Sequence, residues 1–122
     1  MEIPRPAWVP EDAWELDGYV FDLDDTLTAE ARARISRRGN AYAIRVARLA
    51  TEETSAYEDM TCQQMLMEQW ADCRPAVRGI THDGRELTPA ERAQVLDNIT
   101  FLSQDCISNE VVGLNQLGLK KK

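Results

Sequence analysis

The stretch YVFDLDDTLT, residues 19–28, joins an apolar run to a cluster of aspartates and then to a threonine. Alternation in its first half predicts a β-strand, because successive side chains of a strand point to opposite faces. Asp22 and Asp24 would lie on one face, and the other would carry Tyr19, Phe21 and Leu23. Thr28 precedes sequence rich in Ala and Arg, which predicts a helix capped by that threonine. The stretch therefore places a strand directly before the first helix.

The residues before this stretch predict a β-hairpin. Asp17-Gly18 separates two short runs, residues 14–16 and 19–21, which share the apolar alternation of strands. Asp-Gly is typical of a two-residue hairpin turn, because both turn positions need a positive φ. Residues 1–13 contain three prolines and are expected to form an extended arm.

Helices are expected after this hairpin. The first covers residues 29–50, either as one helix or as two with a bend at Gly39. Ser55 and Glu58 form a capping-box pattern, which predicts the start of a second helix. That helix would end at Cys73, because the Arg-Pro pair that follows disfavours helical backbone.

The second half of the chain continues with helices after a connector at residues 77–84. Thr88 and Glu91, with a proline between them, predict the start of another helix. A last amphipathic segment carries Ile107, Val111, Leu114 and Leu117. The predicted fold class is mainly α: an N-terminal β-hairpin followed by four or five helices in a small bundle. The predicted domain covers residues 14–118, and residues 119–122 form a basic tail.

Length and composition restrict the class of protein. A chain of 122 residues is expected to form one domain. Its net charge of −7 argues against a nucleic-acid-binding protein, because binding the phosphate backbone requires a basic face. No apolar run approaches the length of a membrane span, and no signal pattern is seen, so we expect a cytoplasmic protein that binds no membrane.

The cysteines and the single histidine predict neither a disulfide framework nor a metal site. Cys62, Cys73 and Cys106 are odd in number and widely spaced. Together with His82 they form no Cys-x-x-Cys or His-x-x-x-His pair, which structural zinc sites commonly use. We therefore expect free thiols, an ordinary turn histidine, no metal and no cofactor.

Charge is segregated along the chain. Residues 1–30 contain nine acidic residues and one arginine, whereas residues 31–50 contain six arginines and no acidic residue. One interpretation is pairing within the molecule. The other is head-to-tail association of copies into an oligomer, a heterologous contact that can build rings or filaments. The residues expected to mediate such self-association are Asp22, Asp24, Asp25, Arg32 and Arg48.

The motif Asp22-Leu23-Asp24-Asp25-Thr26 resembles the first motif of the haloacid dehalogenase superfamily of phosphotransferases. That resemblance implies a Mg²⁺-dependent phosphatase with Asp22 as nucleophile and Asp24 as general acid/base. The superfamily also uses a lysine, a late acidic pair and a parallel sheet. Here the only lysines are residues 120–122, and helices are expected to dominate after residue 28. Phosphatase activity is therefore kept as an alternative, and we expect a protein that is not an enzyme.

The order of elements from Trp14 to Arg32 resembles the small tail assembly chaperones of long-tailed bacteriophages. Members of that family are short, acidic and mostly helical, and a hairpin leads through Leu-Thr or Leu-Ser into their first helix. The resemblance implies a protein of the host cell cytoplasm that binds the tape measure protein, helps to recruit tail tube subunits and forms homo-oligomers. It implies no cofactor, nucleic acid or membrane partner.

The three lysines at residues 120–122 are compatible with this resemblance. Lysine codons contain only A and G in the pattern AAA or AAG, so three in a row create an adenine-rich message on which ribosomes can slip. In the chaperone family, such slippage near the end of the short protein produces a longer, frameshifted form. A plain solubilising lysine cluster is the simpler interpretation.

Under the chaperone hypothesis, the expected partner-binding residues lie on the first two helices: Tyr57, Leu66, Trp70, Arg34, Arg38 and Arg45. The apolar members could instead fill the core. A second alternative is a small acidic phage accessory protein, such as a virion component or an inhibitor of host defence. In that case an acidic surface around Asp22, Asp24 and Asp25 could mimic nucleic acid.

Overall fold

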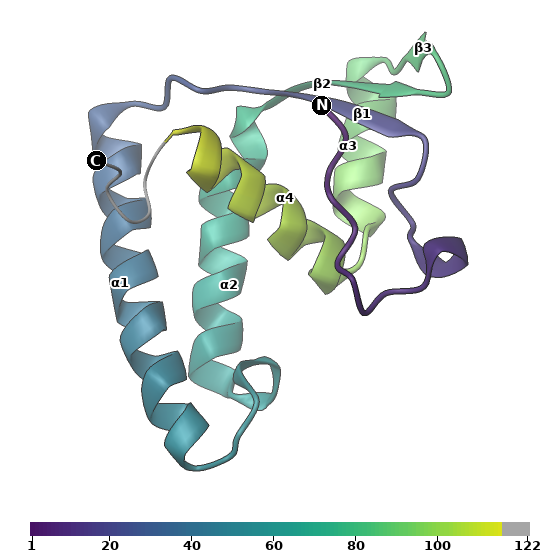
Figure 1. The fold of residues 1–122 in the computed structure, drawn as a ribbon. Helices are drawn as coiled ribbons and strands as arrows, with labels where there is room; N and C mark the ends of the chain where they lie inside the picture. Colours follow the sequence, from purple (N-terminus) through teal and green to yellow (C-terminus); the bar gives the residue numbers. More distant parts are fainter. Residues whose placement is uncertain (116–122) are drawn as a thin grey trace.

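The structure, a computed structural model, describes residues 1–115. Leu117 and the predicted lysine tail lie outside these residues. The largest unit is an antiparallel pair of helices, α1 (Ala29–Thr51) and α2 (Met60–Cys73), crossed by α4 (Phe101–Leu114) (Figure 1). A small sheet lies at one end of this unit and consists of β1 (Tyr19–Leu23), β2 (Val77–His82) and β3 (Arg85–Glu86). Helix α3 (Pro89–Asn98) lies beside the sheet. Three short 3₁₀ helices complete the described chain: η1 (Glu11–Ala13), η2 (Ala56–Glu58) and η3 (Arg74–Ala76).

The predicted fold class is confirmed. The chain is mainly helical, with antiparallel β-structure that begins near the N-terminus and four α-helices in residues 1–115. Thr28 caps α1 by accepting a hydrogen bond from the Ala31 N–H, and α1 continues through Gly39 as one helix. Thr88 and Glu91 form the predicted capping box of α3.

The pairing of the predicted hairpin is corrected. Strand β1 forms as predicted, but it pairs with β2 rather than with residues 14–16. Phe21 opposes Ile80 in this pairing, and both side chains are only 1% exposed. Because the long-range pairing buries two large apolar side chains against the helices, it offers far more apolar burial than a local ribbon. Residues 15–18 form turns instead.

The two-residue hairpin of this protein uses the other Asp-Gly of the sequence. Asp83 and Gly84 both have positive φ, 51° and 83°, and connect β2 to β3. The segment predicted as a connector is therefore strand and turn, which corrects that expectation. Gly18 also has positive φ, and its carbonyl accepts a 3.1 Å hydrogen bond from the Asp83 N–H. The two Asp-Gly turns thus lie against each other.

The start of α2 also differs from the prediction. Ser55 accepts a hydrogen bond from the Tyr57 N–H, but this caps only the 3₁₀ helix η2. Helix α2 begins after Asp59, whose side chain accepts a hydrogen bond from the Cys62 N–H. The Ser55–Glu58 pattern therefore marks the start of the short 3₁₀ helix η2 and not the start of α2.

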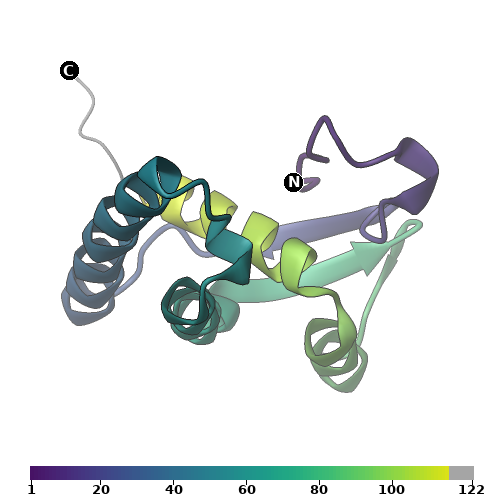
Figure 2. The ribbon, with the colours of Figure 1, turned by 90° about the horizontal axis from the view of Figure 1, so that it is seen from below.

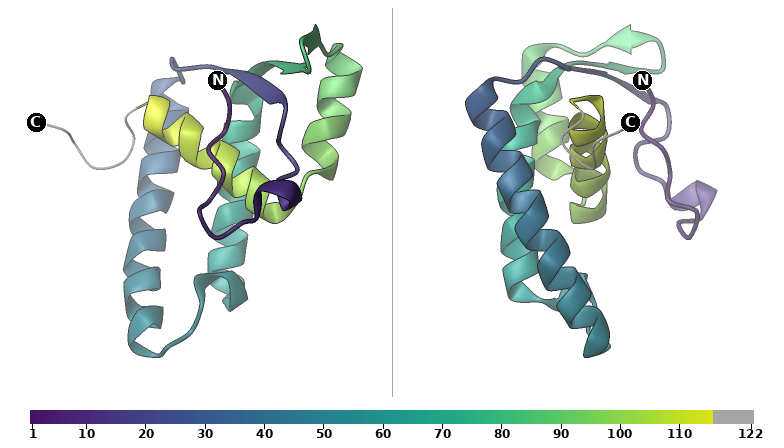
Figure 3. Two further views of the ribbon diagram at one scale, coloured as in Figure 1. Left: turned by 45° about the vertical axis from the view of Figure 1, so that its right-hand side comes forward. Right: turned by 60° about the vertical axis from the view of Figure 1, so that its left-hand side comes forward.

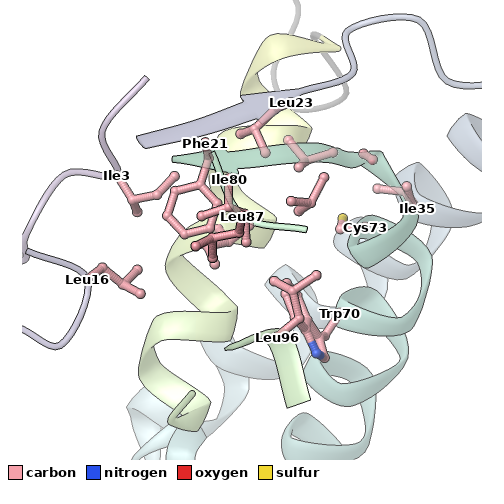
Figure 4. Packing of buried hydrophobic residues seen from close by; sticks show 14 residues of the cluster. Ile3, Leu16, Phe21, Leu23, Ile35, Trp70, Cys73, Ile80, Leu87 and Leu96 are labelled. Atoms are coloured by element: carbon pink, nitrogen blue, oxygen red, sulfur yellow. The ribbon is translucent and has the colours of Figure 1, made fainter. Parts of the chain in front are cut away.

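All four helices lie on the same side of the sheet (Figures 1 and 2). The inner face of the sheet packs on them, and Figure 4 shows Phe21, Ile80 and Leu87 clustered between the N-terminal segment and α2. Cys73 belongs to this core as a buried free thiol, in line with the prediction. No helix in the described part of the chain is both long and apolar enough to cross a membrane.

The predicted N-terminal arm is only partly extended, because residues 7–13 contain a turn and the 3₁₀ helix η1, and the arm packs on the domain. The Met1 carbonyl accepts a 2.7 Å hydrogen bond from the Phe21 N–H, and the Met1 amino group donates to the Phe21 carbonyl at 2.9 Å. Ile3 is 4% exposed and joins the core. The arm therefore covers the outer edge of β1 at Phe21.

Candidate partner-binding groove

A groove of about 300 Å³ lies between α1, α2 and α4. Its apolar lining consists of Tyr42, Met65, Leu66 and Val112, and its polar lining consists of Arg38, Gln69, Asp105 and Asn109. The helix pair α1–α2 extends beyond α4 at the end that carries η2. This part of the helix pair is therefore not covered by other helices (Figure 3). The groove opens where the helix pair leaves the rest of the domain.

Gly39 helps to keep the groove open. It lies in the middle of α1 and lines the groove. A Cβ added to Gly39 would meet no heavy atom within 4 Å. Ala would be about 1 kcal/mol more favourable than Gly within a helix, so the local backbone gives no reason for a glycine here. The missing side chain instead leaves space on the groove wall.

The groove contains a partly buried carboxylate, Asp105. Its Oδ2 accepts a 3.0 Å hydrogen bond from the phenol of Tyr57, which reaches from η2. Burial raises the pKa of Asp105, although the Tyr57 hydrogen bond opposes this shift. Desolvation and then the nearby Asp105 charge raise the pKa of both Tyr42 and Tyr57, so both phenols stay protonated at neutral pH. The charged side chains of the lining are therefore the Asp105 carboxylate at one end and the paired Arg38.

Tyr57 is further held by an aromatic contact. Its ring meets the ring of Phe101 edge-on, with centroids 6.1 Å apart and an interplanar angle of 83°. Such edge-to-face pairs are a favoured aromatic geometry. The hydrogen bond to Asp105 and the Phe101 contact together fix the η2 loop against the start of α4.

Of the predicted partner-binding residues, only Leu66 and Arg38 line the groove, and Tyr57 lies next to it through its hydrogen bond to Asp105. Leu66 is half-buried in its wall, and Tyr57 is 44% exposed at its Asp105 end. Trp70 is only 8% exposed and points into the core beside Leu96, so its prediction as a surface contact is corrected (Figure 4). It lies on the buried face of α2, which the apolar stripe alone could not distinguish from a binding face.

The three arginines predicted to bind a partner pair within the molecule. Arg34 and Arg38 both contact Asp72 of α2, at 3.1 and 2.7 Å, and Arg45 holds Asp59 at 2.8 Å. Burial alone would raise the pKa of Asp72, but hydrogen bonds from the two arginines hold it below its usual value. Their contact with a partner stays a prediction, now for side chains that already have an intramolecular carboxylate. For these three arginines, the charge of the basic helix is paired within the molecule.

The aspartate cluster of the opening stretch faces solvent at the end of β1. Arg78 lies 3.2 Å from Asp22 and 4.0 Å from Asp24. Asp24 also accepts hydrogen bonds from the side chain and then the backbone of Thr26, which hold the pKa of Asp24 below its usual value. Within residues 1–115 there is no group of three or more His, Cys, Asp or Glu side chains that could hold a metal ion.

The remaining residues predicted for self-association are exposed. Asp25, Arg32 and Arg48 form no ion pair with any other residue of the described chain. They differ in this respect from Asp22 and Asp24, which share Arg78. The structure thus leaves one acidic and two basic side chains on the surface for contacts between copies.

A second, open hollow of about 420 Å³ lies between the sheet and α3. His82 stacks on Tyr19 there, with ring centroids 4.0 Å apart, and Arg85 pairs with Glu91 at 3.2 Å. The charged side chains that line this hollow are already paired or exposed to solvent. They therefore do not form a cluster of reactive groups. The sequence interpretation missed the Tyr19–His82 stack because it depends on the long-range pairing of β1 with β2.

Sequence reasoning also missed three residues of the groove: Gly39 as part of its wall, Tyr42 and Asp105. Tyr42 falls at seven-residue steps from Ile35 and Leu49, on one apolar stripe of α1, and that stripe was the available signal. Asp105 lies on a helix of which the sequence interpretation emphasised only the apolar positions.

Comparisons of the chain with protein-family models, with curated proteins and with solved structures gave no match.

Proposed function

We propose that this protein is a non-enzymatic binding protein of the tail assembly chaperone type. In this proposal it holds an amphipathic helical segment of the tape measure protein and helps to recruit tail tube subunits in the host cell cytoplasm. The α1–α2–α4 groove would take apolar side chains from one face of that segment, a mode of recognition that many helix-binding proteins use.

The observation that carries the proposal is the groove itself. It combines an apolar centre with a polar rim, and Leu66 and Tyr57 were expected to bind a partner on sequence grounds alone. Farther along the same helix pair, Ile44 and Met60 are 68% and 81% exposed. Exposed methionine suits a surface that adapts to several side-chain shapes. These features support a protein-binding surface on the projecting helix pair.

The proposal is tested by co-expression with the tape measure protein encoded in the same phage genome. We expect the two proteins to co-purify at a fixed ratio. Leu66→Glu should abolish co-purification, because it places a charge in the apolar wall of the groove. Met67→Glu is the matched control: Met67 is the next residue, 56% exposed and outside the groove lining, so this variant should co-purify as the wild type does.

Loss of co-purification in both variants, or in neither, would count against the groove as the binding site. A source genome without a tape measure gene would overturn the chaperone proposal and favour another small acidic accessory protein. Circular dichroism of each variant separates loss of binding from loss of folding.

The phosphatase alternative has less structural support. Asp22 lies on the antiparallel strand β1 and Asp24 follows directly after it, whereas the resemblance implies a parallel sheet. Each carboxylate contacts Arg78, and Asp24 is also bound to Thr26. We therefore propose binding rather than hydrolysis as the activity of this chain.

A further inference from the structure

We propose that the groove selects a lysine side chain of its partner, with the aliphatic stem between Tyr42 and Leu66 and the ammonium group on Asp105. This inference rests on the proposed function in one respect, since it names the chemistry of the segment that the same groove takes. It is tested without the tape measure protein, so either proposal can fail alone.

The negative charge of Asp105 lacks a cationic partner in the described chain. The groups that face it are the phenols of Tyr57 and Tyr42 and the thiol of Cys106, which are neutral at neutral pH. Tyr57 donates to Oδ2, and among residues 1–115 no group donates a hydrogen bond to Oδ1. A partly buried carboxylate of this kind gains more from a cation than an exposed carboxylate would.

The positive charge nearest the groove is already compensated. All three nitrogens of the Arg38 guanidinium have partners: Nη1 contacts Gln69 at 2.6 Å, Nη2 contacts Asp72 at 2.7 Å, and Nε lies 3.5 Å from Glu68. Arg38 therefore does not neutralise Asp105. The net unpaired charge of the groove is negative, which complements a basic residue of a partner.

The shape of the groove favours lysine over the other basic side chains. Its wall is formed by Tyr42, Met65, Leu66 and Val112, which suit a chain of methylene groups. One carboxylate oxygen is available, and a single oxygen accepts a compact ammonium. Arginine binds carboxylates best with two parallel hydrogen bonds, but Tyr57 already occupies Oδ2.

The probe for this inference is n-pentylammonium, which reproduces the stem and charge of lysine, with n-pentanol as the uncharged control of the same length. Backbone amide shifts of ¹⁵N-labelled full-length protein are followed during each titration. We expect shifts at Tyr42, Leu66 and Val112. The ammonium should bind about tenfold or more tightly than the alcohol, because a hydrogen bond to a charged group contributes about 1.5–3 kcal/mol.

Asp105→Asn removes the charge and retains an acceptor for Tyr57, so the preference for the ammonium should disappear. Gly39→Leu should block both probes and retain the helix. Tyr57→Phe should preserve or increase the preference, because it releases Oδ2. A retained preference in Tyr57→Phe would show that the Asp105 charge binds the ammonium, and that the Tyr57–Asp105 hydrogen bond is not needed for it.

The inference would be overturned by equal binding of the two probes, by a preference that persists in Asp105→Asn, or by ammonium-induced shifts confined to the exposed cluster around Asp22 and Asp24. Absence of binding by both probes would overturn it as well. If Asp105→Asn does not fold, blockage of the ammonium by Gly39→Leu decides whether the groove is the site. None of these results bears on co-purification with the tape measure protein, which tests the proposed function separately.

Discussion

The phenol oxygen of Tyr57 donates a 3.0 Å hydrogen bond to Asp105 Oδ2, and the two residues are 48 positions apart in the sequence. This bond connects η2, in the loop between α1 and α2, to α4. It closes one end of the groove and fixes the position of the helix pair beside α4.

Tyr57→Phe should destabilise the protein by about 1 kcal/mol, because it leaves the partly buried Asp105 carboxylate without its donor. Partial exposure of Tyr57 keeps the loss at the lower end of the usual range. Urea denaturation monitored by circular dichroism measures the free energy of unfolding. Hydrogen exchange at residues 55–59 should accelerate in the variant. Unchanged stability and exchange would mean that the bond does not hold the loop.

Asp105→Asn should remove one pH-dependent contribution to stability. The pKa of Asp105 is raised in the folded state, first by burial, above its ordinary value of 3.8. The folded state therefore binds this proton more tightly than the unfolded state, so the Asp105 contribution to the free energy of unfolding decreases as pH rises from 3.8 through the folded pKa. Relative to wild type, the Asn variant should gain stability over that range. A gain that does not change with pH would contradict this assignment.

Asp72→Asn should cost about 1 kcal/mol, because Asp72 holds both Arg34 and Arg38 and its side chain is only 17% exposed. Its pKa lies below the ordinary value of 3.8, so its contribution is present at neutral pH and lost as pH falls below 3.8 through the folded pKa.

Asp22→Asn is the matched control, since the Asp22–Arg78 pair is 66% and 53% exposed. That variant should lose less than about 0.5 kcal/mol. Thermal unfolding at pH 7 and at acidic pH compares the two variants. Equal losses would indicate that the helix-pair contacts contribute no more than a surface pair.

The wild-type protein should not hydrolyse a generic phosphate ester in the presence of Mg²⁺. Asp22 is on an antiparallel strand, Asp24 directly follows that strand, and both are already paired with Arg78. The assay uses p-nitrophenyl phosphate with wild type and Asp22→Asn. Activity in wild type that disappears in the variant would replace the binding proposal with the phosphatase alternative.

Head-to-tail association through unpaired surface charge should depend on salt. The exposed Asp25 and the exposed Arg32 and Arg48 are the groups available to such a contact. Light scattering should detect oligomers at low ionic strength that dissociate as salt screens these charges. Arg32→Gln combined with Arg48→Gln should give the same dissociation at low salt. A monomer at every salt and protein concentration would contradict the association.

Local signals predicted the helices well, because capping and apolar periodicity act within one turn or two. Thr28 and Thr88 cap helices where the sequence placed them. The sheet was harder to predict, because Asp17-Gly18 and Asp83-Gly84 carry the same turn dipeptide. Only the burial of Phe21 against Ile80 decides that the second dipeptide forms the hairpin and the first forms a turn against it.

The groove was only partly predictable for the same reason. Leu66 and Tyr57 follow from the pattern of one helix and its loop. Asp105 and Gly39 acquire a role only when α4 is placed against α1 and α2. Likewise, the basic residues of α1 look free in the sequence, and their partner Asp72 becomes visible only when the two helices pack side by side.

We propose that the groove between α1, α2 and α4 binds a helical segment of the tape measure protein, and calorimetric titration of that segment into wild type, Gly39→Leu and Gly113→Leu measures this binding. Both glycines are helical, and an added Cβ meets nothing within 4 Å at either, but only Gly39 lines the groove. We predict that Gly39→Leu abolishes binding and Gly113→Leu does not. Wild-type affinity in Gly39→Leu would contradict the claim.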